Sequence, residues 1–170
     1  MSARILVACV GNVFFGDDGF GVEVARVLSR AQLPAGVVLR DVGIRGLHLA
    51  YELLDPPGLL VVVDALPRGG VPGTVYVLEP DLDEVLPGGA DAHSVDLPSV
   101  FAMVRAMGGA LPRVLVVGCE PEDVREGMGL SLPVEQAVAG AVALVEEILQ
   151  RESTQVERGA APGAARELES

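Results

Sequence analysis

The sequence contains no lysine and no tryptophan, and it has few cysteines, histidines and aromatic residues. All 12 basic residues are arginines, and 24 acidic residues bring the formal net charge to −12. Nucleic acids bind clustered cations that displace counterions, and the chain has no such cluster. We therefore expect no nucleic-acid partner, and an acidic body suits a cation or a basic polypeptide better.

Cysteine is too scarce to organise the fold. Only Cys9 and Cys119 occur, each near the end of a valine-rich run. Two cysteines cannot build a disulfide scaffold, and without a C-x-x-C pair they do not form a closed structural zinc site. We expect both to be small core residues.

Long hydrophobic runs are also missing, although half of the residues are apolar. No run approaches the roughly 18 to 20 apolar residues that cross a bilayer. The first apolar run leads directly into Gly11 and Asn12, without the small-residue cleavage site of a signal peptide. We therefore expect a cytoplasmic protein with no membrane partner, built as one compact domain.

Two kinds of apolar pattern alternate along the chain. Short valine-rich runs predict strands at residues 5–10, 37–42, 59–64, 74–78 and 114–119. Apolar residues at helical spacing predict helices at residues 21–30, 47–54, 97–107 and 134–150. This order predicts a single three-layer α/β domain, in which a mostly parallel, twisted, five-stranded sheet has helices on both faces.

Two stretches of the chain depart from this alternation. The connection at residues 69–73 is too short for a helix, which predicts one antiparallel edge strand. The stretch at residues 152–170 has no periodicity, so we expect a domain over residues 1–151 followed by a disordered tail.

Ligands of open α/β sheets bind at the carboxyl ends of the strands, which directs attention to the first loop. Its sequence, GNVFFGDDGFG at residues 11–21, is glycine-rich, but Asp17 stands where a phosphate-binding P-loop needs lysine. The adjacent Asp17 and Asp18 suit a metal ion or a water molecule. The alternative is that one of them only caps the following helix.

Two further residues follow later strands. Asp64 ends the third predicted strand and is either a site residue or a turn residue. His93 precedes the third predicted helix and is either a ligand or an exposed histidine. His48 fits a solvated helix face. Two carboxylates from strand ends and one imidazole would together form a nitrogen and oxygen ligand set for a divalent transition metal with open positions. The chain has no G-x-S-x-G or H-E-x-x-H motif, which argues against those hydrolase types.

The order of these motifs resembles that of the hydrogenase maturation proteases, which are endopeptidases of nickel-iron hydrogenase assembly. The likeness covers about residues 4–149 and rests on the segments at residues 11–21, 41–47, 63–65, 118–121 and 129–131, together with His93. The resemblance implies that Asp18, Asp64 and His93 bind nickel, with Asp18 and Asp64 as catalytic residues. It also implies that Gly43 and Ile44 bind substrate, where the family usually has Gly-Thr.

The resemblance further implies a reaction. The chain would remove the C-terminal extension of a hydrogenase large-subunit precursor after nickel insertion, and the substrate would supply the nickel. Either the metal activates water or polarises the carbonyl, or a carboxylate acts as general base. Two alternatives remain open: a nickel-dependent checkpoint module that does not cut, and an enzyme that uses Asp17 and Asp18 around a magnesium-held phosphate.

Overall fold

The computed structural model describes residues 4–83 and 96–159. Its strands are β1 (Ile5–Val10), β2 (Val37–Gly43), β3 (Leu59–Ala65), β4 (Val75–Leu78) and β5 (Arg113–Cys119). They form one sheet in the order β2-β1-β3-β5-β4. Every neighbouring pair is parallel except β4 with β5. The predicted mostly parallel sheet with one antiparallel edge strand is confirmed.

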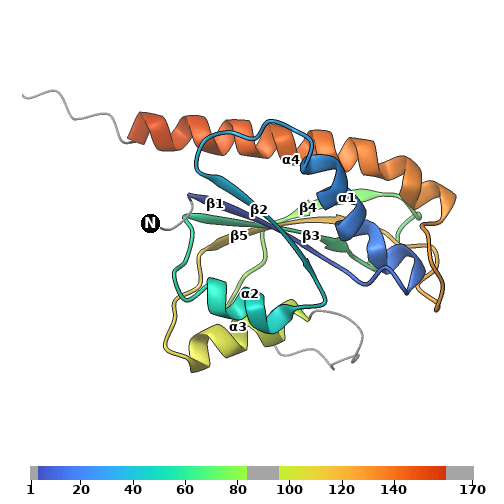
Figure 1. The fold of residues 1–170 in the computed structure, drawn as a ribbon, viewed down its shortest axis with the longest axis horizontal. Coiled ribbons are helices and arrows are strands. Elements are labelled where there is room, and N and C mark those ends of the chain that lie inside the picture. Colours follow the sequence, from blue (N-terminus) through green and yellow to red (C-terminus); the bar gives the residue numbers. More distant parts are fainter. Residues whose placement is uncertain (1–3, 84–95, 160–170) are drawn as a thin grey trace, which may run out of the picture.

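Helices cover both faces of this sheet (Figure 1). They are α1 (Phe20–Leu28), α2 (Gly46–Glu52), α3 (Leu97–Ala106) and α4 (Leu132–Gly159), and a short 3-10 helix, η1 (Gly16–Gly19), precedes α1. Helices α1 and α4 pack on one face, and α2 and α3 pack on the other. The predicted three layers are therefore confirmed, while η1 lies in a segment that we expected to be loop.

The central strands carry the core because both of their faces are covered. All six residues of β1 are buried, and they alternate between the two helical layers. Burial of an aliphatic side chain contributes roughly 1.5 to 3 kcal/mol, so the valine-rich runs favour this central position. Cys9 and Cys119 lie in the core as expected, both as free thiols. Burial, with the charge of Asp41, raises the pKa of Cys9 to about 12, which keeps this thiol protonated.

Helix α4 is longer than the sequence pattern predicts. It continues through Gly159, so the predicted tail at residues 152–170 is wrong for its first eight residues. Glu152 is buried, and its Oε2 pairs with Nη1 of Arg113 at 3.1 Å, which ties the extra turns to the start of β5. Residues 160–170 lie outside the described residues. None of the helices in the described ranges has the length and hydropathy needed to cross a bilayer.

The connections of the neighbouring strands β1 and β3 lie on opposite faces of the sheet. The chain leaves β1 through α1 on one face, and it reaches β3 through α2 on the opposite face. Neighbouring strands whose connections leave in opposite directions form a topological switch point, where an open α/β sheet leaves a crevice at its carboxyl edge. The loop after β1 and the end of β3 lie at this switch point.

Close backbone packing at this point depends on Gly21, at the start of α1. A Cβ atom on Gly21 would lie 2.6 Å from the carbonyl oxygen of Val63 and closer still to that of Val10. Carbonyl oxygens of two strands cannot move aside as a flexible side chain can. The helix therefore approaches β1 and β3 only with glycine at this position.

Substitution of glycine should separate this packing constraint from helix propensity. We expect Gly21→Ala to lower the free energy of unfolding by about 1 to 3 kcal/mol, because the methyl group overpacks the junction. Gly140→Ala is the matched control, since nothing lies within 4 Å of a Cβ there. In the exposed interior of α4 it should raise stability by about 0.5 to 1 kcal/mol. Urea unfolding of both variants checks this, and equal effects would contradict it.

Candidate functional site at the carboxyl edge of the sheet

Asp18 and Asp64 are placed by two neighbouring strands. Asp18 lies in η1, which follows β1, and Asp64 is the last residue but one of β3. The Oδ2 atom of Asp18 accepts the backbone N–H of Asn12 at 3.0 Å, and its carbonyl oxygen accepts the same N–H at 3.1 Å. Both aspartates are partly buried. The structure thus brings these two predicted site residues to the switch point.

The two carboxylates influence each other electrostatically. Burial raises the pKa of Asp64 well above its ordinary value, and the charge of Asp18 raises it further, against a hydrogen bond from the Ala65 N–H. Burial also raises the pKa of Asp18, against the hydrogen bond from Asn12. A proton or a cation would relieve the repulsion between the two groups. Such a pair suits cation binding and proton transfer.

The third predicted ligand, His93, lies outside the described residues. Among residues 4–83 and 96–159, no three histidine, cysteine, aspartate or glutamate side chains come together as a metal site. The described part of the site thus offers two carboxylates, and a complete ligand set needs donors from elsewhere. His48, the other histidine, is exposed on α2, as predicted.

Gly43 and Ile44 lie at the same edge, at the end of β2. The carbonyl oxygen of Gly43 accepts the N–H of Gly11 at 3.0 Å, which ties this loop to the loop after β1. Gly43 has a φ of +56°, a conformation that favours glycine. The side chain of Ile44 is 60% exposed. An exposed apolar side chain at this edge of the sheet is suited to contact a bound polypeptide.

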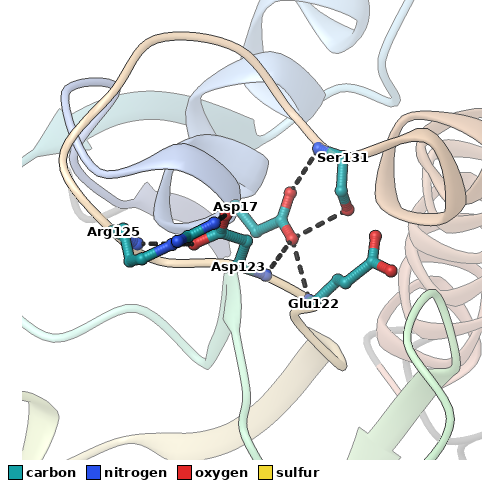
Figure 2. A network of polar contacts seen from close by, with 5 residues as sticks. All are labelled: Asp17, Glu122, Asp123, Arg125 and Ser131. Carbon is teal, nitrogen blue, oxygen red and sulfur yellow. Dashed lines mark hydrogen bonds and ion pairs between the residues drawn. The ribbon is translucent and has the colours of Figure 1, made fainter.

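Asp17 has a role that the sequence analysis missed. Its carboxylate is fully buried and accepts the N–H groups of Glu122, Asp123 and Ser131 and the hydroxyl of Ser131, at 2.7 to 2.9 Å (Figure 2). It makes no side-chain capping bond, so the capping interpretation is wrong for this residue. Burial acts to raise the pKa of Asp17, but these hydrogen bonds outweigh it and hold the pKa below its ordinary value.

Glu120 is a second buried carboxylate that the sequence analysis missed. It accepts the N–H of Arg68 at 2.7 Å, the N–H of Gly69 at 2.9 Å and the hydroxyl of Tyr76 at 3.2 Å. The guanidinium of Arg68 lies 5.4 Å from the centre of the Tyr76 ring. Glu120 therefore fixes the connection that follows Asp64. No local pattern announces these partners, which lie 44 to 52 residues away.

The raised pKa of Asp64 predicts how stability depends on pH in chelator-treated protein. The native state binds the Asp64 proton more tightly than the unfolded chain does. This tighter proton binding therefore adds to the free energy of unfolding. The added stability is complete below the pKa of Asp64 in the unfolded chain, about 3.9, and is lost as pH rises through its pKa in the folded protein. Asparagine stays neutral, so Asp64→Asn does not lose this stability. We therefore expect the melting temperature of Asp64→Asn, minus that of the unchanged protein, to increase between about pH 4 and pH 8. Thermal unfolding measures this.

The exposed Asp55 provides the control for this experiment. Asp55→Asn makes the same substitution at an exposed position. If the advantage of Asp64→Asn shrinks as pH rises, the sign of the pKa shift is wrong.

Comparison with known proteins identifies the family. Residues 22–148 match the family described as hydrogenase maturation protease (HycI). This region contains Asp64 and His93 and begins four residues after Asp18. The chain is 34% identical over 142 residues to the hydrogenase expression/formation protein HupD of Rhodobacter capsulatus. That alignment covers 82% of this chain and 66% of HupD, so the chain spans just under two thirds of that relative's length.

Solved structures agree with this match. The hydrogenase maturating endopeptidase HybD from E. coli has a TM-score of 0.76 at 27% identity, over 87% of this chain and 93% of HybD. The [NiFe] hydrogenase maturation protease HycI from Thermococcus kodakarensis KOD1 has a TM-score of 0.70 at 26% identity, with the same coverage. The family match, the relative and the solved structures together show that the chain belongs to the hydrogenase maturation protease family.

Proposed function

We propose that this chain removes the C-terminal extension from the large-subunit precursor of a nickel-iron hydrogenase once nickel has been inserted into that precursor. The nickel belongs to the substrate. The observation that carries the proposal is the pair of Asp18 and Asp64 at the switch point, where the charge of Asp18 raises the pKa of Asp64. Membership of the family supplies the reaction type.

Charge explains why the peptidase would recognise only a loaded precursor. Asp18 and Asp64 repel each other when both are ionised, and a divalent cation offsets this repulsion. A precursor that carries nickel provides that cation, with His93 as a third ligand from this chain. An empty precursor leaves the repulsion in place and binds more weakly. The same contact holds the cleavable peptide beside the two carboxylates.

Two chemical routes to peptide-bond cleavage are open to this pair. In the first, the substrate's nickel polarises the scissile carbonyl or activates a water molecule. In the second, Asp18 or Asp64 takes a proton from the attacking water as general base.

The structure argues against the phosphate-binding alternative. That alternative needs the carboxylates of both Asp17 and Asp18 around a magnesium-held phosphate. The oxygens of Asp17 already accept four hydrogen bonds from the segment at residues 122–131. Only one carboxylate of that pair remains for a ligand.

Substitution of the three site residues tests the proposal. We expect Asp18→Asn, Asp64→Asn and His93→Ala each to slow cleavage of nickel-loaded precursor by about 100-fold or more, since each removes a ligand or a proton-transfer group. Asp55→Asn and His48→Ala are matched controls and should cleave at the unchanged rate. Mass spectrometry of the precursor, with and without nickel, measures the product.

Two outcomes of that experiment would overturn the proposal. If all three site variants cleave at the rate of the unchanged protein, the site is elsewhere. If the unchanged protein binds precursor in a nickel-dependent way but leaves its mass unaltered, the chain is a checkpoint module and does not cut.

The exposed side chain of Ile44 makes a separate prediction about substrate binding. We expect Ile44→Ser to raise KM for the precursor about 3-fold to 10-fold with little change in kcat, because it removes an apolar contact but no reacting group. Val156→Ser is the control, since Val156 is also exposed but lies near the end of α4. Steady-state cleavage kinetics check this, and a fall in kcat at constant KM would contradict the assignment.

A further inference from the structure

We propose that Asp17 is a positioning residue for the cleavage reaction. Its buried carboxylate joins η1 to the segment at residues 122–131 and so holds Asp18 in place beside Asp64. This inference rests on the proposed function, but it concerns a residue that does not touch the substrate.

The hydrogen bonds of Asp17 use both of its carboxylate oxygens (Figure 2). Oδ1 accepts the N–H of Ser131 at 2.7 Å, and Oδ2 accepts the N–H groups of Glu122 and Asp123 at 2.8 and 2.9 Å and the Ser131 hydroxyl at 2.8 Å. The donors lie 105 to 114 residues further along the chain. The carboxylate of Asp123 is itself paired with Arg125, so only its backbone faces Asp17.

Main-chain hydrogen bonds join the same two segments. The N–H of Asp17 donates to the carbonyl of Asp123 at 2.9 Å, and the N–H of Gly16 donates to the carbonyl of Gly127 at 2.8 Å. The N–H of Gly127 donates in turn to the carbonyl of Phe14 at 2.8 Å. Because η1 has only four residues, its position is fixed mainly by these contacts and less by its own helical turn.

Because Asp17 and Asp18 are successive residues of η1, the contacts that hold η1 also determine where Asp18 lies. In a 3-10 helix successive side chains point about a third of a turn apart, so Asp17 faces the segment at residues 122–131 while Asp18 faces a different direction. Asp18 is held on its other side by the N–H of Asn12, which donates to both its carbonyl and its Oδ2. A shift of η1 would therefore move Asp18 relative to Asp64.

The contacts of Asp17 exclude two other roles. It is no ligand for nickel or for a water molecule, because its oxygens are fully buried and already accept four hydrogen bonds. It is no helix cap either, since its carboxylate bonds to a distant segment and makes no capping bond. Positioning remains, and in enzymes a misplacement of about 1 Å can cost about 100-fold in rate.

The test compares Asp17→Asn with a matched control. Asparagine keeps one acceptor oxygen but points an amide N–H2 at backbone N–H donors. We expect kcat for nickel-loaded precursor to fall about 10-fold to 100-fold, with KM changed less than about 3-fold. The control, Glu152→Gln, disturbs a buried carboxylate paired with Arg113 at the start of β5 and should leave kcat unchanged. Ser131→Ala removes one donor of the four and should give a smaller loss, about 2-fold to 5-fold.

Hydrogen exchange supplies a readout independent of cleavage. The Asn12 amide, which donates to Asp18, should exchange faster in Asp17→Asn than in Glu152→Gln. A folded Asp17→Asn that keeps both its kcat and its Asn12 protection overturns the inference. If Asp17→Asn does not fold, Ser131→Ala decides by the same two measurements.

The failure of the proposed function can be recognised separately. If the unchanged protein does not cleave the precursor, the proposed function fails, and Asn12 exchange alone then decides whether Asp17 positions Asp18. Faster exchange in Asp17→Asn supports the inference, and exchange equal to that of the control overturns it.

Discussion

Burial of β1, β3 and β5 between two layers of helices is the constraint on which the rest of the structure depends. Strands covered on both faces must be apolar along their length, so polar side chains can appear only where these strands end. Parallel strands end at one common edge. The carboxylates of the loop after β1, of β3 and of the segment after β5 therefore gather there, and the opposed connections of β1 and β3 make this edge a topological switch point.

The carboxylates at this edge differ in how fully donors compensate their charge. Asp17 accepts four hydrogen bonds and Glu120 accepts three, so each fixes a loop. Burial instead raises the pKa values of Asp18 and Asp64, and the charge of Asp18 raises that of Asp64 further. Carboxylates with a full set of donors stabilise the native state, whereas a repelling pair favours binding of a cation or a proton. The structure thus separates supporting residues from candidate reactive ones.

Loops from four strands depend on one another at this site. The loop after β2 is tied to the loop after β1 by the hydrogen bond from Gly11 to Gly43, and the segment after β5 is tied to η1 by Asp17. Glu120, just after β5, holds the connection that follows β3. A substrate that contacts any one loop therefore meets a set of loops that are hydrogen-bonded to one another.

The sequence by itself determined the strands, the helices and the placement of Asp18 and Asp64 at one edge, because apolar periodicity and strand ends are local features. Only the tertiary structure revealed the partners of Asp17 and Glu120 and the continuation of α4 through Gly159. The hydrogen-bond partners of Asp17 and Glu120 lie 44 to 114 residues away, and Glu152 in the added turns of α4 pairs with Arg113, 39 residues before it. Such contacts leave no periodic trace in the chain, since either partner alone looks like an ordinary acidic residue in a loop or on a helix.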